Sequence, residues 1–155
     1  MLSQSVERSL PYSSALLFDL AADVERYPEF LRWWISARIR RLEAEAYYTD
    51  QVLGFGPVRV SFASKTVLRR PDRIDVTSDE PPFRQFHLSW IFEPRPGGGC
   101  RVRLVAALEF HSRFLQRLVD RVMRVEIAEI ISAFEKRAHR LYRNADRALE
   151  NAPPP

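Results

Sequence analysis

The sequence predicts an α+β fold in which a curved antiparallel sheet of about six or seven strands wraps around one long C-terminal helix. Apolar and polar residues alternate through most of residues 35–110, as in antiparallel strands with one buried and one solvated face. Residues 113–150 instead repeat apolar positions every three or four residues without an internal glycine or proline, which is typical of an amphipathic helix. Helices that are segregated from a consecutive run of strands indicate the α+β class.

The chain before the main sheet predicts one strand and two short helices. Residues 2–10 alternate as a strand does. Ser13 or Ser14 can cap a helix through residues 15–21, because a serine hydroxyl accepts hydrogen bonds from the backbone N–H groups of the first turn. Pro28 prevents a smooth continuation of this helix but suits the first turn of a second short one.

Further strand-like segments follow, separated by turns rich in glycine and proline. They cover residues 35–40, 45–53, 58–69, 73–78, 85–92 and 101–110. The alternation assigns an inner side to each of them except 45–53, whose facing stays ambiguous. The turn at 54–57 is expected to lift an exposed Phe55 at its tip. The apolar stripe of the last helix should plug the curled sheet, so residues 1–150 are expected to form one domain and residues 151–155 a disordered tail.

The composition is that of an ordinary globular domain, with 46% hydrophobic and 28% charged residues in a chain of 155, and it excludes wholesale disorder. The net charge of +4 is a modest and scattered surplus, so charge alone does not favour a nucleic-acid partner. The single cysteine, Cys100, excludes an intramolecular disulfide framework and a multi-cysteine metal site. The sequence has no apolar run of roughly 18 residues and no apolar block near its start. We therefore expect a cytoplasmic protein that can touch the inner membrane peripherally.

The inner positions of the sheet and the apolar stripe of the last helix form the first candidate site, a ligand cavity. The candidate lining is Phe62, Ser64, Phe86, Leu88, Trp90, Leu104 and Leu108 from the strands, with Met123, Ile127, Ile130 and Phe134 from the helix. The pattern alone leaves two interpretations open, since the same side chains could close into an ordinary core or surround an apolar ligand. Ser64 could orient a polar atom of such a ligand or bond only to the backbone.

The second candidate site is an aromatic cluster that follows the short helices. It consists of Tyr27, Pro28, Phe30, Trp33 and Trp34, joined by Phe55 from the later turn. These residues either cover one end of the sheet or form the mouth of the pocket, where Trp and Tyr tolerate a boundary between apolar and wet surroundings. In the second case, the neighbouring Arg26 and Arg32 can meet anionic lipid head groups.

The sequence assembles no evident catalytic or metal site. His87, His111 and His139 lack the spacing of metal ligands. Cys100 stands beside a glycine-rich hairpin without an evident base. We therefore expect no catalytic residues, no metal, no enzymatic activity and no cofactor.

Several motifs resemble those of one protein family. The stretch DLAADVERYPEFLRWW (residues 19–34) is similar to the signature of the coenzyme Q-binding proteins, a branch of the START-like or polyketide cyclase/dehydrase superfamily. The match continues through WIFEP (90–94), EFHSR (109–113) and AFEKRA (133–138), and it spans roughly residues 2–142. Bacterial members of this branch are also named ribosome association toxins.

The resemblance implies a helix-grip fold with a lipophilic pocket, in a non-enzymatic protein that binds or chaperones a polyprenyl quinone, either ubiquinone or a late precursor. Such a protein supports respiratory electron transport or quinone biosynthesis. The implied partners are the quinone, quinone-biosynthesis or respiratory proteins, a transient membrane contact and a second copy in a homodimer. The alternative is a toxin-like regulator that binds the large ribosomal subunit and blocks subunit association. A cyclase or dehydratase is less favoured, because no acid–base pair stands out.

Overall fold

The computed structural model describes the backbone of residues 2–150 and the side chains of residues 3–122 and 127–143. Its centre is a seven-stranded antiparallel sheet, as predicted, with the strand order β1-β7-β6-β5-β4-β3-β2. The strands are β1 (Leu2–Leu10), β2 (Trp34–Leu42), β3 (Ala46–Phe55), β4 (Val58–Arg69), β5 (Arg73–Ser78), β6 (Phe83–Pro94) and β7 (Cys100–Phe110). The predicted tail, residues 151–155, lies outside the described residues.

Two short helices link β1 to β2, as the sequence predicted. α1 (Ser14–Ala22) begins after the N-cap Ser13, whose hydroxyl oxygen accepts a hydrogen bond from the Leu16 backbone N–H at 3.2 Å. η1 (Val24–Glu29) is a 3-10 helix that contains Pro28. It starts before this proline, earlier than expected, because the chain already turns after α1.

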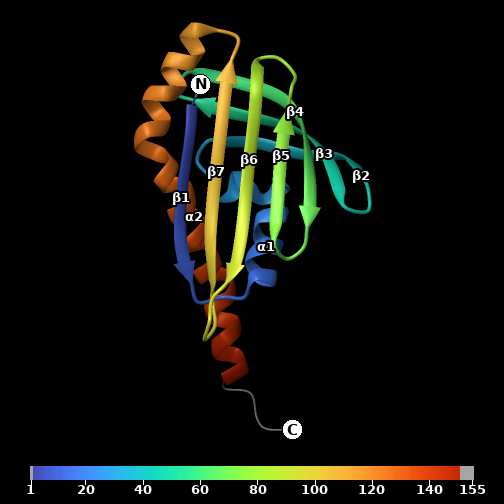
Figure 1. Ribbon diagram of the computed structural model, residues 1–155, viewed down its shortest axis with the longest axis vertical. Coiled ribbons are helices and arrows are strands. Elements are labelled where there is room, and N and C mark those ends of the chain that lie inside the picture. The colour runs from blue at the N-terminus through green and yellow to red at the C-terminus, as the bar shows by residue number, and fades with distance from the viewer. Residues whose placement is uncertain (1, 151–155) are drawn as a thin grey trace.

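α2 (Arg113–Glu150) is the predicted long helix, and it lies across the concave face of the sheet (Figure 1). Its fully buried side chains include Val119, Ile131, Phe134 and Ala138. Phe134 packs against Trp90 of β6 with ring centroids 4.7 Å apart, so the core lies between α2 and the inner side of the sheet. Leu141, which the periodicity placed on the same stripe, is 42% exposed. The end of α2 projects beyond the strands (Figure 1), where no sheet remains to cover it.

A β-bulge at the start of β2 turns Trp34 into the interior. Trp34 pairs with Leu53 and Ser36 pairs with Val52, so Ile35 is an extra residue without a partner on β3. Strict alternation would have kept Ile35 on the inner side, but its side chain is 41% exposed. The bulge thus exchanges an isoleucine for a tryptophan in the core.

Phe55 is buried, which corrects the expectation that it stands exposed at the tip of a turn. It is the last residue of β3, and its side chain is 4% exposed. Its ring centroid lies 5.8 Å from that of Trp33, so the two rings cover each other. The turn itself consists of Gly56 and Pro57, and the φ of +60° at Gly56 is one that glycine adopts without strain.

Candidate functional site

A small apolar cavity lies between the sheet and α2. Its lining is Trp33, Trp34, Leu53, Phe55, Phe86, His87, Leu88, Leu104, Ala106, Leu108, Ile127 and Ile130. The structure therefore brings together strand, helix and aromatic residues that the sequence assigned to two separate sites. The cavity volume is about 30 Å³, far below the roughly 300–1,000 Å³ of a typical ligand pocket. In this state the side chains nearly fill the interior.

Of the other residues of the predicted lining, Phe62, Trp90 and Phe134 pack in the core beside the cavity. Phe62 lies between Phe83 and Phe86, with ring centroids 4.9 and 5.0 Å away. Trp90 packs against Phe134, and its buried Nε1 has no hydrogen-bond partner among the described residues. Met123 belongs to the part of α2 whose side chains lie outside the description.

A buried cluster of polar side chains borders the cavity. Trp34 Nε1 donates a hydrogen bond to Gln51 Oε1 at 2.8 Å. Gln51 Nε2 donates to Thr49 Oγ1 at 3.1 Å and to Ser64 Oγ at 2.9 Å, and the two hydroxyls are 2.6 Å apart. Each of these side chains is at most 8% exposed. Since buried polar groups are costly unless they are hydrogen-bonded, the cluster is self-satisfied, and it gives the otherwise apolar interior one polar side.

Of this polar cluster, the sequence identified Ser64 and, as part of the aromatic cluster, Trp34. Thr49 and Gln51 belong to β3, whose facing the alternation left ambiguous because polar residues occupy both of its sides. In the structure Thr49 pairs with Ser64, and Gln51 pairs with Phe62. Because directly opposite residues of antiparallel strands share a face, the inward register of β4 was the signal that could have placed them.

Two buried tyrosines tie the interior to the end of α1. The Tyr47 hydroxyl donates to a carbonyl oxygen of α1 at 2.8 Å, and the Tyr27 hydroxyl donates to the preceding one. Burial raises the pKa of both hydroxyls, so both remain protonated donors at neutral pH. Tyr27 is 4% exposed and contacts the rings of Phe30 and Trp34 edge-on. It therefore supports the predicted mouth from inside and does not reach the surface.

The cavity, a small pocket and an open groove lie in series toward the surface, and this series is here called the path. Next to the cavity is a pocket of about 80 Å³. The residues that it shares with the cavity are Trp33, Trp34 and Ile130. Outside it lies an open groove of about 530 Å³, here called the mouth groove. The mouth groove is lined by Phe30, Glu129, Ser132, Ala133, Lys136, Arg137 and Arg140. The inner pocket and the mouth groove share Phe30, Glu129 and Ala133.

The predicted mouth residues divide along this path. Phe30, Trp33 and Trp34 line the pocket just outside the cavity. Phe55 lines only the inner cavity, and Pro28 is exposed beside the path. The aromatic cluster is therefore a plug of mostly buried rings, not a set of exposed ones.

Two ion pairs cross the path and join the η1 side to α2. Arg137 Nη2 lies 3.0 Å from Glu29 Oε2, and the Arg137 guanidinium sits 5.3 Å from the centre of the Phe30 ring. Arg32 Nη2 lies 3.4 Å from Glu129 Oε2. The Arg32 and Glu129 side chains are 67% and 62% exposed, whereas the Arg137 side chain is 11% exposed. Exposed ion pairs contribute little to stability. The Glu29–Arg137 pair therefore holds η1 to α2 more strongly than the Arg32–Glu129 pair does, and it is here called the clasp.

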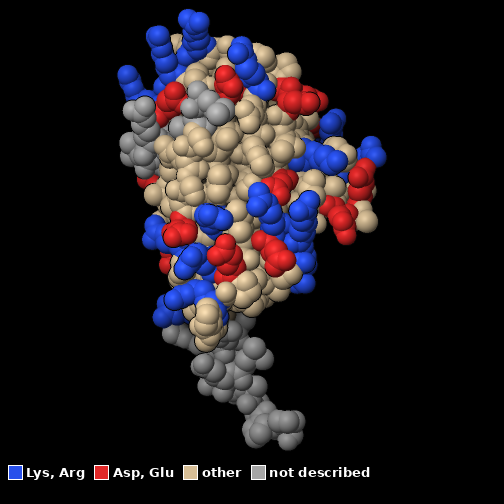
Figure 2. All heavy atoms as spheres, in the orientation of Figure 1, with Lys and Arg blue, Asp and Glu red and all other residues tan. Residues whose placement is uncertain are grey.

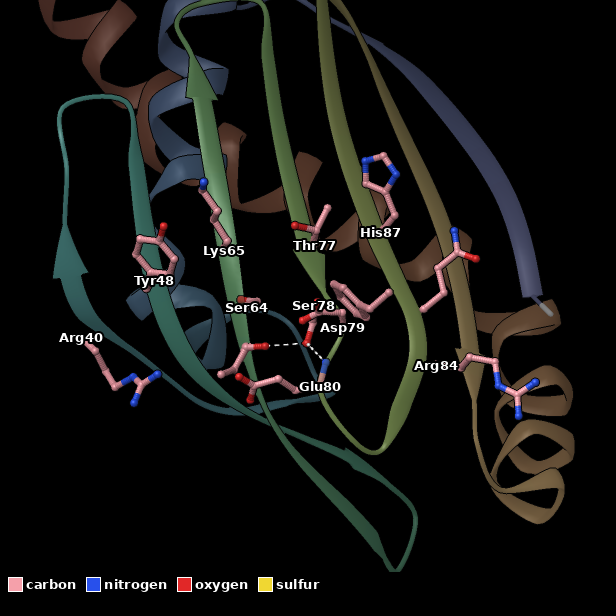
Figure 3. Close-up of a pocket in the computed structure, with 13 residues that line it drawn as sticks. Arg40, Tyr48, Ser64, Lys65, Thr77, Ser78, Asp79, Glu80, Arg84 and His87 are labelled. Carbon is pink, nitrogen blue, oxygen red and sulfur yellow. Dashed lines mark hydrogen bonds between the residues drawn. The ribbon is translucent and has the colours of Figure 1, made fainter.

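The convex face of the sheet carries a second hollow, the convex groove, of about 550 Å³ (Figure 3). It lies where β5 ends and leaves the start of β4 without a neighbour on that side. Its charged side chains are the basic Arg40, Lys65 and Arg84 and the acidic Asp79 and Glu80. Lys65 Nζ lies 5.7 Å from the centre of the Tyr48 ring, within cation–π range. This groove is polar and of mixed charge, unlike the cavity on the concave face.

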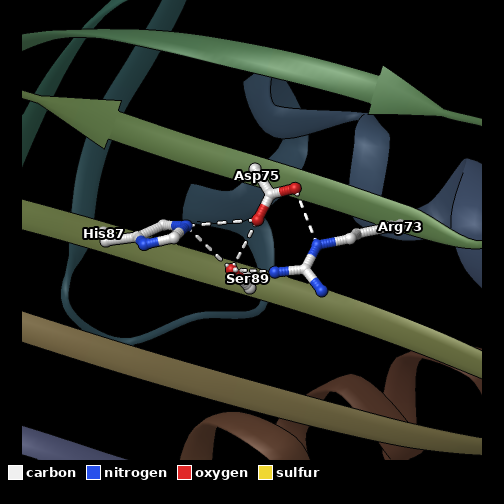
Figure 4. A network of polar contacts seen from close by, with 4 residues as sticks. All are labelled: Arg73, Asp75, His87 and Ser89. Carbon is white, nitrogen blue, oxygen red and sulfur yellow. Dashed lines mark hydrogen bonds and ion pairs between the residues drawn. The ribbon is translucent and has the colours of Figure 1, made fainter.

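A polar network on the same face brings together residues that the sequence left separate (Figure 4). Ser89 Oγ donates to Asp75 Oδ1 at 2.6 Å, and His87 Nε2 lies 3.1 Å from the same oxygen. Arg73 Nε lies 2.8 Å from Asp75 Oδ2. Ser89 is 3% exposed and its proton is already committed to Asp75. These contacts form a structural ion-pair network and not a nucleophile–base arrangement.

Outside these grooves, the surface shown in Figure 2 carries mixed charge. On the face shown in Figure 2, acidic and basic side chains are interspersed around a central area without charge. Burial raises the pKa of the Cys100 thiol, which makes it a poor nucleophile. No group of His, Cys, Asp and Glu that could hold a metal occurs among the residues that the structure describes. Within the same part of the chain, no helix is both long and apolar enough to cross a membrane.

The relatives of this chain include a toxin and a coenzyme Q-binding protein. A ribosome association toxin, RatA of Pseudomonas aeruginosa, is 26% identical over 143 residues, which cover 91% of this chain and 99% of that protein. A mitochondrial coenzyme Q-binding protein, COQ10 homolog B of Xenopus laevis, is 25% identical over 142 residues, which cover 89% of this chain and 58% of that protein.

Solved structures share the fold. The 18 kDa protein CC1736 from Caulobacter crescentus has a TM-score of 0.74 and 28% identity, covering 92% of this chain and 99% of that one. The Zhui aromatase/cyclase from Streptomyces sp. R1128 has a TM-score of 0.75 at 13% identity, covering 90% of this chain and 95% of that one, a likeness of fold alone. The family described as polyketide cyclase/dehydrase and lipid transport has a model that matches residues 10–135. With this match over most of its length and a sheet that grips its last helix, the chain belongs to the polyketide cyclase/dehydrase and lipid transport family.

Proposed function

We propose that the protein binds a lipid between its sheet and α2, and that this lipid is a polyprenyl quinone, either ubiquinone or a late precursor. The main support is that the apolar cavity lies next to the buried polar cluster, with Trp34 belonging to both. A quinone has the same division, since its tail is apolar and its ring oxygens accept hydrogen bonds. Membership of a lipid transport family and a relative named coenzyme Q-binding protein add support.

The polar cluster can donate a hydrogen bond to a quinone oxygen without leaving any of its own buried groups unpaired. Gln51 Nε2 is the available donor, and it is shared between Thr49 and Ser64. These two hydroxyls are 2.6 Å apart and can satisfy each other. The Gln51 amide can therefore donate to a ligand oxygen while its own Oε1 still accepts from Trp34.

Ligand entry requires the cavity to expand, because about 30 Å³ holds little more than one water molecule. Each buried CH₂ group contributes roughly 0.8 kcal/mol, so a ring and a few isoprene units can offset an outward movement of η1 or α2. The rest of a long tail would leave along the path past Trp33, Trp34 and Phe30. There it would enter a membrane or a second copy of the protein.

A carrier is favoured over an enzyme by the nature of the lining. The titratable residue of the cavity lining is His87, and its imidazole is held by Asp75 on the convex face. The other lining side chains are aliphatic or aromatic and supply no acid or base. In this proposal the protein acts without catalysis in the cytoplasm, touches the inner membrane transiently and delivers quinone to biosynthetic or respiratory proteins.

Organic extraction of the purified protein followed by mass spectrometry tests the proposal. The wild type should release a polyprenyl quinone. Leu104→Phe should release much less, because Leu104 lines the cavity and a larger ring fills the space that the ligand must open. Leu17→Phe is the matched control, since Leu17 is equally buried in α1 and does not line the cavity. Wild-type quinone content in a folded Leu104→Phe variant, or the absence of lipid from the wild type, would contradict the proposal.

A second candidate function is regulation of the large ribosomal subunit, which would block subunit association. It is favoured by the relatives named ribosome association toxin and by the convex groove, where Lys65, Arg84 and Tyr48 offer cationic and stacking contacts to RNA. Arg59 and Arg101 are exposed on the outer side of β4 and β7 but do not line this groove.

Co-sedimentation with large subunits tests the second candidate. Binding to RNA should weaken steeply with salt, and a Lys65→Ala/Arg84→Ala variant should bind less than an Arg59→Ala/Arg101→Ala variant with the same charge. Co-sedimentation that follows this order would favour the ribosomal function. No co-sedimentation at low salt would remove it.

A further inference from the structure

We propose that the mouth groove is a docking site for the phosphate head groups of a lipid bilayer, and that phosphate bound there withdraws Arg137 from Glu29 and unlocks the path into the cavity. The groove opens to solvent along one side of α2 and continues inward through the pocket that it borders. Docking follows from the surface chemistry alone. The idea that unlocking the path allows lipid to enter or leave the cavity rests on the proposed function.

The cations of the groove have hydrogen-bonding capacity to spare. Lys136 and Arg140 are exposed and have no ion-pair partner among the described residues. They stand four residues apart, so both project from one side of α2. Arg137 lies between them in sequence, and its Nε is buried without a hydrogen-bond partner in the part of the chain that the structure describes. A phosphate oxygen is an acceptor that such a guanidinium can bind at two nitrogens at once.

Both residues of the clasp can exchange their partner, because Glu29 already contacts a second arginine. Glu29 Oε2 contacts Arg137 Nη2 at 3.0 Å and also Arg26 Nη1 at 3.5 Å. When Arg137 turns to a phosphate, Glu29 therefore keeps a cationic partner and no carboxylate is stranded. The second crossing pair, Arg32 with Glu129, is exposed and offers little resistance. Both partners of the clasp are thus satisfied in the locked and in the unlocked state.

A bilayer fits this groove better than a free anion does. The groove is about 530 Å³ and open, which suits several head groups at a surface rather than one enclosed ion. The half-buried Phe30 ring stands at the same rim, under the Arg137 guanidinium. An aromatic ring beside basic side chains is the composition of a membrane-interface contact.

Flotation with lipid vesicles tests the docking site. The wild type should bind vesicles of phosphatidylglycerol mixed with phosphatidylcholine, and should bind pure phosphatidylcholine weakly. Lys136→Ala/Arg140→Ala should lower partitioning to the anionic vesicles about thirtyfold, since each basic residue near such a surface contributes about 1 kcal/mol. Arg59→Ala/Arg101→Ala removes the same charge from the sheet's outer side and should cost less than threefold.

Equal losses in the two double variants, or no loss in the first, would overturn the docking site. Inorganic phosphate at the same phosphate concentration should not release the protein from vesicles. Release by inorganic phosphate would show that the groove takes a free anion and not a membrane. The vesicle experiments require no quinone, so they can support the docking site even if the protein carries none.

Acrylamide quenching of tryptophan fluorescence tests the clasp in the absence of lipid. Trp33 and Trp34 line the path, whereas Trp90 is 1% exposed in the core. Glu29→Gln weakens the hold on Arg137 without adding a like charge, and should raise the quenching constant at least twofold. Glu25→Gln, in the same helix, is the control and should leave it unchanged. An unchanged constant in folded Glu29→Gln would overturn the unlocking step, while a change in both variants would show that η1 has merely loosened.

Discussion

Trp34 and Gln51 are joined in the interior by a hydrogen bond of 2.8 Å from the indole Nε1 to the amide Oε1, and neither side chain is more than 8% exposed. The bulge at Ile35 turns the indole inward, and the amide fixes where it points. Because the Trp34 ring lines both the cavity and the pocket outside it, this one bond positions the wall between them.

Replacing Gln51 by leucine should destabilise the protein by about 1–3 kcal/mol. The change leaves the Trp34 indole N–H buried without an acceptor, which costs the desolvation of that donor. Thr49 and Ser64 lose the hydrogen bonds from Gln51 but keep their mutual one, so the indole is the group that is left without a partner. Urea unfolding followed by circular dichroism measures it.

The double variant Gln51→Leu/Trp34→Phe separates the lost bond from lost packing. Removing both partners of a buried hydrogen bond costs less than removing one, because no donor is left unsatisfied. The double variant should therefore lose less stability than the sum of the two single variants. Strict additivity of the two losses would show that the indole and the amide do not depend on each other.

Periodicity was sufficient to predict the strands and the long helix. Alternation along β6 and β7 and the three- and four-residue steps along α2 are local patterns, and the burial of Trp90, Leu104 and Phe134 follows from them. The architecture then followed from the order of elements, since consecutive antiparallel strands pair with their neighbours. The lining residues that follow from these patterns are Phe86, Leu88, Leu104, Leu108, Ile127 and Ile130.

Other features of the site depend on how neighbouring strands pair, and the sequence of a single strand does not reveal this pairing. The facing of Thr49 and Gln51 is set by the register of β3 against β4. The bulge at Ile35 appears only when β2 is aligned with β3. Asp75 and Ser89 meet because they are directly opposite on β5 and β6. In each case the missing information was the register between strands.

Gly99→Ala should destabilise the protein by about 1–3 kcal/mol, more than Gly98→Ala does. Both glycines have positive φ, +80° and +112°, so both substitutions strain the backbone. At Gly99 an added Cβ would also lie 2.5 Å from the Leu10 carbonyl oxygen, whereas at Gly98 it meets open space. Thermal unfolding of the two variants measures the difference. Equal losses of stability in the two variants would mean that the backbone of β1 can shift at Leu10 to make room for the added Cβ.

The Asp75 carboxylate makes the stability of the fold depend on acid pH. Burial alone would raise the pKa of Asp75, but the hydrogen bonds from Arg73, Ser89 and His87 outweigh it and lower the pKa to about 2. An unperturbed aspartate has a pKa of about 3.9. A folded-state pKa below the unfolded one contributes stability above about pH 4, and this contribution is lost as the pH falls toward 2.

Asp75→Asn should therefore lower the unfolding free energy at pH 7 by on the order of 2 kcal/mol and by much less at pH 2.5, because protonation has by then removed most of the advantage of the wild type. The comparison requires urea unfolding of both proteins at pH 7, 4 and 2.5. Asp72→Asn is the control, since Asp72 is exposed and lies outside the network. It should change stability little at any of the three pH values. If the difference in unfolding free energy between wild type and Asp75→Asn stayed constant from pH 7 to 2.5, the network would stabilise the fold through its hydrogen bonds and packing and not through the charge of Asp75.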